Sequence, residues 1–85
     1  MIDNKKCILI ADDEKEIRDI LTLLLNAEGY HVIAAEDGQE AVDKASDDID
    51  LFILDVNMPC LTGIMAAVEL RKTYQTPIIF LTAYS

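Results

Sequence analysis

The sequence predicts an α/β fold, with a doubly wound parallel sheet covered by helices on both faces. Four short apolar runs alternate with three segments of helical periodicity along the 85 residues. The runs cover residues 7–11, 31–35, 51–54 and 78–81, and they are rich in Ile, Leu, Val and Phe, as strands buried on both faces are. Strict alternation of strand and helix favours parallel strands joined by right-handed crossovers.

Two of the expected strands carry signs of their position in the sheet. The run 31–35 begins with His31 and contains two alanines, which favours an edge strand. His31 begins this strand, so we expect it at the end of the sheet away from any strand-end site, in a structural or surface role. Pro77 stands just before the run 78–81, where a strand tolerates proline.

The helical segments are expected at about residues 14–27, 39–46 and 63–73. Gly29 is a natural stop for the first, whose apolar arc, widened by Leu23 and Leu25, is broader than a surface helix needs. We therefore expect part of that arc to stay uncovered. The second carries one narrow apolar stripe. The third carries four apolar residues: Ile64, Ala67, Val68 and Leu70.

Composition excludes several classes of protein. Seven basic against sixteen acidic residues give a net charge of −9, so nucleic acid is not an expected partner. A hydrophobic fraction of 52% argues against disorder. The apolar run 7–11 is too short for a signal peptide or a membrane helix, so we expect a cytoplasmic chain with no membrane contact. Cys7 and Cys60 are too few for a disulfide framework and are expected to be free thiols.

Acidic residues follow two of the expected strands. Asp12 and Asp13 come directly after the first strand, and Asp55 follows the third. Sites in parallel sheets form at the carboxyl ends of strands, so these carboxylates are expected to converge. Their mutual repulsion can be relieved by a shared proton or by a hard cation. Mg²⁺ suits oxygen ligands, whereas no His or Cys is placed to hold zinc.

The same rim carries the groups that phosphoryl transfer needs. Thr82 follows the run 78–81 and adds a hydroxyl to the acidic cluster. An aspartate can attack phosphorus to form an acyl phosphate, and catalysis then consists mainly of positioning and of charge neutralisation by Mg²⁺. The added phosphoryl charge would force nearby loops to rearrange, which makes a conformational switch an expected outcome.

Three segments together resemble the receiver domain of two-component response regulators. They are Ile8-Leu9-Ile10-Ala11-Asp12-Asp13-Glu14, then Leu54-Asp55-Val56-Asn57-Met58-Pro59 followed by Gly63, and Pro77-Ile78-Ile79-Phe80-Leu81-Thr82-Ala83. The resemblance implies a flavodoxin-like sheet, here with strand order 2-1-3-4. It also implies phosphorelay signalling with a histidine kinase as partner. The style of the last segment is common in regulators of transcription.

The resemblance also implies a role for each residue of the cluster. Asp55 is expected to be the phosphoryl acceptor. Asp12, Asp13 and Asp55, with the backbone carbonyl of Asn57, are expected to hold Mg²⁺. Thr82 is expected to be the switch hydroxyl, and Ala83 the small residue beside it. Such a chain is a phosphorylation-controlled switch, not a metabolic enzyme.

The chain departs from the family beyond strand four. Receivers have a fifth strand with an invariant lysine, so residues 1–85 are expected to form a C-terminally incomplete receiver domain that lacks the last helix-strand-helix. The chain can therefore also be an inactive fragment or an interaction module, with a homodimer through the exposed edge at 78–81, and not a well-behaved monomer. An aspartyl-phosphate phosphatase is a weaker alternative, because Asn57 stands where that family needs an acid.

Overall fold

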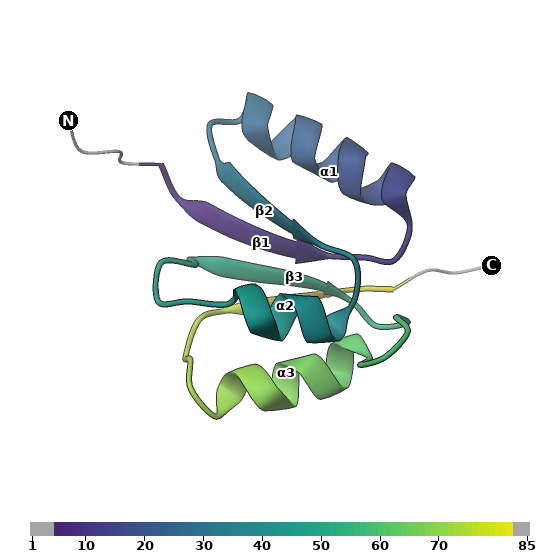
Figure 1. The fold of residues 1–85 in the computed structure, drawn as a ribbon. Coiled ribbons are helices and arrows are strands. Elements are labelled where there is room, and N and C mark those ends of the chain that lie inside the picture. Colours follow the sequence, from purple (N-terminus) through teal and green to yellow (C-terminus); the bar gives the residue numbers. More distant parts are fainter. Residues whose placement is uncertain (1–4, 83–85) are drawn as a thin grey trace.

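The computed structural model describes residues 5–82 and has the alternating order that the sequence predicts (Figure 1). Four strands and three helices follow one another in the described part of the chain: β1 (Cys7–Ala11), α1 (Lys15–Ala27), β2 (His31–Ala35), α2 (Gly38–Lys44), β3 (Leu51–Asp55), α3 (Gly63–Arg71) and β4 (Ile78–Leu81). The expected strand bounds are confirmed to within one residue. The helices α2 and α3 each end two residues earlier than expected, at Lys44 and Arg71.

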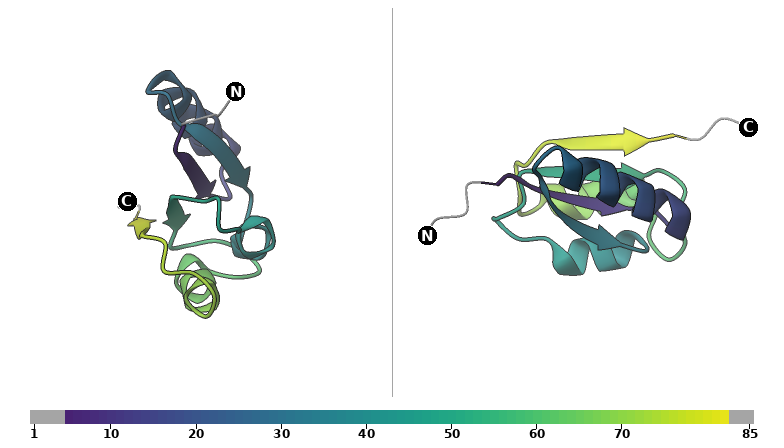
Figure 2. Two further views of the ribbon diagram at one scale, coloured as in Figure 1. Left: turned by 90° about the vertical axis from the view of Figure 1, so that its left-hand side faces the viewer. Right: turned by 90° about the horizontal axis from the view of Figure 1, so that it is seen from above.

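The strands form one parallel sheet in the order β2-β1-β3-β4, as expected. The register pairs Cys7 with His31 and Ala11 with Ala35, and on the other side of β1 it pairs Ala11 with Leu54. The carboxyl ends of the four strands therefore share one edge. Figure 2 shows α1 against one face of the sheet and α2 with α3 against the other, which is the doubly wound arrangement.

The face under α2 and α3 holds the main core. Its largest fully buried side chains come from the sheet and from α3: Leu9, Phe52, Leu54 and Leu70. The rings of Phe52 and Tyr74 lie 6.2 Å apart at a tilt of 54°. The Tyr74 hydroxyl donates a hydrogen bond of 3.2 Å to the carbonyl oxygen of Ala45, which ties the α3–β4 connection to the end of α2.

The face under α1 is less completely covered. None of the residues of α1 is buried, and Leu23 is 70% exposed, as the overwide apolar arc predicts. Ile20 and Leu24 are also exposed, whereas Leu25, which we expected to lack a partner, is half-buried. The strand side chains beneath α1 include Ile8 and Ile10, and both are buried.

Only some of the apolar residues of α3 face the core. Gly63, Ala66 and Leu70 are buried, while Ile64 and Val68 are each about half exposed. Nearly every position of this helix is apolar, so periodicity could not select a face. The close approach of α3 to the sheet selects the small residues, since a Cβ at Gly63 would overlap the carbonyl oxygen of Asp55.

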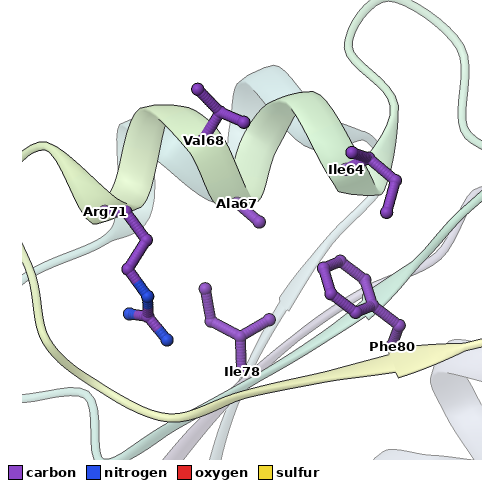
Figure 3. A pocket seen from close by; sticks show the side chains of 6 residues that line it. All are labelled: Ile64, Ala67, Val68, Arg71, Ile78 and Phe80. Carbon is purple, nitrogen blue, oxygen red and sulfur yellow. The ribbon is translucent and has the colours of Figure 1, made fainter.

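Apolar side chains of α3 that do not enter the core line an open cavity beside β4. This space of about 500 Å³ is lined by Ile64, Ala67 and Val68 of α3 and by Ile78 and Phe80 of β4. Figure 3 shows Ile64 and Ala67 on the side of α3 that faces β4. Arg71 closes one end and donates hydrogen bonds to the carbonyl oxygens of two residues in the α3–β4 connection, Tyr74 and Thr76.

Three further expectations concern the cysteines and the membrane. Cys7 is buried and Cys60 is exposed in the β3–α3 loop, and both are free thiols, as expected. Cys60 has a φ of 66°, in the left-handed region that favours glycine. None of the helices within residues 5–82 has both the length and the apolar composition that a bilayer crossing requires.

Candidate functional site

Three carboxylates converge where β1 and β3 end. Asp12, Asp13 and Asp55 each offer an oxygen, and these oxygens lie within 4.8 Å of one another. The convergence follows from the register, since Ala11 pairs with Leu54 and the acids are the next residues along each chain. Asp12 is buried, Asp55 is half-buried and Asp13 is exposed, so the cluster opens to solvent on one side.

Asp12 is held by hydrogen bonds at its backbone and its side chain. Its amide donates to the carbonyl oxygen of Ala35 at 3.2 Å, which ties it to the end of β2. Its Oδ1 accepts from the amide of Glu14 at 2.9 Å, at the entry to α1. Its own carbonyl oxygen accepts from Arg18 Nη1 at 2.8 Å.

Burial, and to a lesser extent the acidic neighbours, make Asp12 harder to ionise. Burial raises the pKa of Asp12 above its ordinary value, and the amide hydrogen bond from Glu14 opposes this shift. The neighbouring charges of Asp55 and Asp13 raise the pKa further. A cation placed among the three carboxylates would offset the free-energy cost of ionising Asp12.

Asp55 is positioned by the close packing of α3. The amide of Asn57 donates to Asp55 Oδ1 at 3.1 Å, and the amide of Gly63 donates to the Val56 carbonyl at 3.2 Å. Because Gly63 has no side chain, the start of α3 can lie against the Asp55 carbonyl. The position of Asp55 is therefore fixed through its backbone, while its carboxylate stays accessible.

A cavity of about 280 Å³ adjoins the cluster. It is lined by six residues from three segments: Asp12, Glu14, Ile17, Asp55, Leu81 and Thr82. The donor set contains carboxylates and no His or Cys, so it fits a hard cation such as Mg²⁺ and not zinc. Asp12, Asp13 and Asp55 are the residues that would hold the ion.

Comparison with known proteins identifies the family. The family model described as response regulator receiver domain matches residues 8–85. This chain belongs to that family. Transcriptional regulatory protein CpxR of Escherichia coli (strain K12) is 50% identical over 76 residues, which cover 89% of this chain and 33% of CpxR. The chain thus spans about a third of the length of the curated relatives it matches.

Solved receiver structures have the same fold. Response regulator TrrA from Thermotoga maritima in complex with Mg(2+)-BeF is 45% identical with a TM-score of 0.84, and the match covers 94% of this chain and 71% of TrrA. TrrA in complex with histidine kinase ThkA matches at 48% identity and a TM-score of 0.85, over 94% of this chain and 71% of that one. Chemotaxis protein CheY4 of Vibrio cholerae matches at 38% identity and 0.84, over 95% and 71%.

The remaining predicted site residues of this receiver domain take different places. Thr82 is exposed and lines the same cavity as Asp12 and Asp55. Asn57 is exposed and contributes its amide to the Asp55 carboxylate. His31 pairs with Cys7 at the opposite end of the sheet, as predicted. Ala83 lies outside the described residues.

Sequence reasoning did not single out Arg18, which contacts the site through the backbone of Asp12. Its side chain is 13% exposed, and its Nη2 also lies 3.6 Å from Glu36. One signal was present in the sequence. Arg18 stands between Ile17 and Leu21, so a charge lies beside the apolar stripe of α1.

Proposed function

We propose that this receiver domain accepts a phosphoryl group on Asp55 from a histidine kinase and acts as a conformational switch. Asp12, Asp13 and Asp55, with the backbone carbonyl of Asn57, hold Mg²⁺ in this proposal. The convergence of three carboxylate oxygens within 4.8 Å beside an open cavity carries it.

The transfer is a displacement at phosphorus. A carboxylate oxygen of Asp55 attacks the phosphorus of a phosphohistidine, the P–N bond breaks, and the imidazole leaves with the bonding electron pair and takes up a proton. The product is an acyl phosphate on Asp55. When bound, Mg²⁺ would neutralise negative charge on the oxygens of the phosphoryl group that is transferred. The hydrogen bond that the Asn57 amide donates orients the attacking carboxylate of Asp55.

Thr82 is the proposed switch residue. Its position on the cavity wall, on the β4 side of Asp55, lets its hydroxyl donate to a phosphoryl oxygen. Phosphorylation adds about −1.5 to −2 charges to the acidic rim. Movement of Thr82 toward that charge would reshape the loop after β4.

Solved structures of a relative support this chemistry. TrrA has been solved with Mg(2+)-BeF and in complex with a histidine kinase. The curated relatives are named transcriptional regulatory proteins, so control of transcription by a protein that carries this domain is part of the proposal. A cytoplasmic location and the absence of nucleic-acid contact by these residues stay predictions.

The proposal is tested by labelling the chain with a small phosphoryl donor such as acetyl phosphate. The wild type should take up label with Mg²⁺ and lose most of it with EDTA. Asp55→Ala should take up none, while Asp43→Asn on α2, whose side chain is exposed, should behave as wild type. Equal labelling of Asp55→Ala would refute the assignment.

A second candidate is an inactive receiver fragment or an interaction module, which forms a homodimer through β4. Ile79 is 51% and Phe80 39% exposed, so this strand presents apolar side chains. Sedimentation decides the point, since a monodisperse monomer excludes the dimer. Failure of the wild type to take label would favour this candidate. Family membership gives the phosphatase alternative no support.

The extent of the domain also stays a prediction. We propose that residues 1–85 correspond to the part of a receiver domain that matches TrrA, and the match covers 71% of the TrrA chain. The reading frame that follows Ser85 in the source would decide the matter. A Lys-Pro pair about 20–25 residues further on is expected from typical helix and loop lengths.

A further inference from the structure

Arg18 of α1 joins the loops that follow β1 and β2. Its Nη1 donates to the carbonyl oxygen of Asp12 at 2.8 Å, and its Nη2 lies 3.6 Å from Glu36 Oε1. The side chain of Arg18 is 13% exposed, whereas that of Glu36 is 71% exposed. The guanidinium is thus largely enclosed, and both of its contacts involve segments at the carboxyl edge of the sheet.

The ion-pair partner of Arg18 is itself supported by α2. The amide of Glu36 donates to Glu40 Oε1 at 3.1 Å, and Lys44 Nζ lies 3.3 Å from the same oxygen. Lys44 Nζ also donates to the carbonyl oxygen of Ala34 at 2.8 Å. The contact of Arg18 with Glu36 therefore extends into a chain of polar contacts that reaches α2.

Arg18 approaches Asp12 from the side away from the cavity. Glu36 follows β2, which lies on the opposite side of β1 from β3 and Asp55. The cavity beside the carboxylates is lined by Asp12 and Asp55 but not by Arg18. The guanidinium holds the backbone of Asp12 without occupying the space that a cation would take.

We propose that Arg18 is a positioning residue for the metal site. The three carboxylates repel one another, and Asp12 stays beside Asp55 because its backbone carbonyl is held by a charged donor. The proposal rests on the proposed function, since it assumes that Mg²⁺ binds among the carboxylates.

The two possible roles of Arg18, as a positioning residue or as a nearby positive charge, predict opposite changes in Mg²⁺ affinity. If Arg18 acted only as a nearby positive charge, its removal would strengthen the attraction of the acidic cluster for a cation. If Arg18 acts by holding Asp12, its removal lets the carboxylate move away and weakens cation binding. The sign of the change in Mg²⁺ affinity therefore separates the two roles.

The decisive experiment compares Arg18→Ala with Lys15→Ala. Lys15 is a matched control, because it is a cation in the first turn of α1 whose ion pair with Asp19 is exposed. Mg²⁺ affinity of the 85-residue chain would be measured by titration calorimetry. Arg18→Ala should bind Mg²⁺ roughly 10-fold more weakly, the size of effect seen for residues that orient metal ligands. Lys15→Ala should bind as wild type.

Conservative variants and kinetics guard against a general loss of structure. Arg18→Lys keeps one donor for the Asp12 carbonyl and should fall between wild type and Arg18→Ala. Glu36→Gln weakens the anchor of the guanidinium and should shift affinity in the same direction by less. At saturating Mg²⁺ the maximal labelling rate of Arg18→Ala should return to nearly that of wild type.

A metal-free measurement separates failure of this inference from failure of the proposed function. The amide of Glu14 donates to Asp12 Oδ1, so its hydrogen exchange without Mg²⁺ reports whether Asp12 is held. Exchange should be faster in Arg18→Ala and unchanged in Lys15→Ala. If the wild type binds no Mg²⁺, the proposed function fails, and this exchange still tests whether Arg18 holds Asp12. Unchanged exchange, or equal or tighter Mg²⁺ binding by Arg18→Ala, would overturn the inference.

Discussion

The sheet has one face covered by α2 and α3 and another covered by α1, and the two differ in how completely their apolar side chains are buried. On the first face, Leu54, Ala66 and Leu70 are almost inaccessible to solvent. On the second, the thirteen residues of α1 include none that is buried. The longest helix of the described residues thus contributes least to the core, although its apolar arc is broad.

The ends of the helices repeat this contrast. Asp37 and Thr62 cap α2 and α3 by accepting hydrogen bonds from backbone amides, whereas Glu14 at the start of α1 makes no side-chain cap bond. Gly38 and Gly63 let the first turns of α2 and α3 lie against neighbouring backbone. The comparison teaches that burial, caps and close backbone contacts occur together, because an element pressed against the sheet must satisfy its end groups locally.

The strongest test of the comparison exchanges one side chain on each face for alanine. Phe52→Ala should lower the free energy of unfolding by about 3–5 kcal/mol, because it empties a fully buried site. Leu23→Ala, at a position 70% exposed, should change it by less than about 0.5 kcal/mol. Urea denaturation followed by circular dichroism measures both. Similar losses would mean that the α1 face is covered in solution.

A second test adds one methyl group where α3 meets the end of β3. Gly63→Ala should destabilise the chain by about 1–3 kcal/mol and slow labelling of Asp55, since the new Cβ must displace the Asp55 backbone. Gly29→Ala is the control. Its φ of 94° is also strained for alanine, but nothing lies within 4 Å of the added Cβ, so labelling should not change. Normal labelling by Gly63→Ala would show that the contact is adaptable.

A third test removes the side-chain cap of α3 in one variant and adds a side-chain cap to α1 in another. Thr62→Ala should destabilise α3 by about 1 kcal/mol, because the amide of Met65 loses its side-chain acceptor. Glu14→Ser should stabilise α1 by roughly 0.5–1 kcal/mol by supplying the missing acceptor. Thermal unfolding measures both, and the comparison fails if the second change has no effect.

A fourth test asks whether the well-packed face carries strain of its own. Cys60 has a φ of 66° in the loop that leads to α3, so Cys60→Gly should raise stability by about 0.5–1 kcal/mol. Cys60→Ala removes the same thiol but keeps the strained backbone, and it should give no gain. Equal behaviour of the two variants would locate the effect in the thiol.

The smallest effect is expected at Asp12, where the α1 face meets the site. The folded-state pKa of Asp12 is raised above its ordinary 3.8, chiefly by burial. An acid shifted upward contributes stability below its ordinary pKa and loses that contribution as pH rises through the folded-state value. Without metal, Asp12→Asn should therefore be more stable than wild type near pH 7, by less than about 1 kcal/mol. Melting temperatures with EDTA and with Mg²⁺ test this, because Mg²⁺ should stabilise only the wild type.

Much of the site could be predicted from the sequence. Asp12, Asp13 and Asp55 each follow an apolar run, and the carboxyl ends of parallel strands lie at the same edge of the sheet. Their convergence could therefore be predicted from the sequence. Arg18 could not be found in this way. Its role depends on the loop at Glu36, which is remote in sequence and is brought near only by the pairing of β1 with β2.

The faces of the helices divide in the same way. For α2 the sequence shows a single narrow apolar stripe, and Ala41, which belongs to it, is fully buried. For α3 the stripe was ambiguous, and the outcome was decided by how closely the helix could approach the sheet. Where small residues and large ones compete for the same contact, periodicity does not distinguish them, and the steric fit does.

The sequence by itself determined the order of elements, the parallel sheet and the edge on which the acidic residues meet, because these follow from local periodicity and chain direction. Only the tertiary structure decided which side of α3 faces the core, how much of α1 stays exposed and how Asp12 is held. Those properties depend on distances between segments that are far apart in the chain. Physical contact between β1, β2 and α1 therefore determines the geometry of a site whose residues the sequence had already indicated.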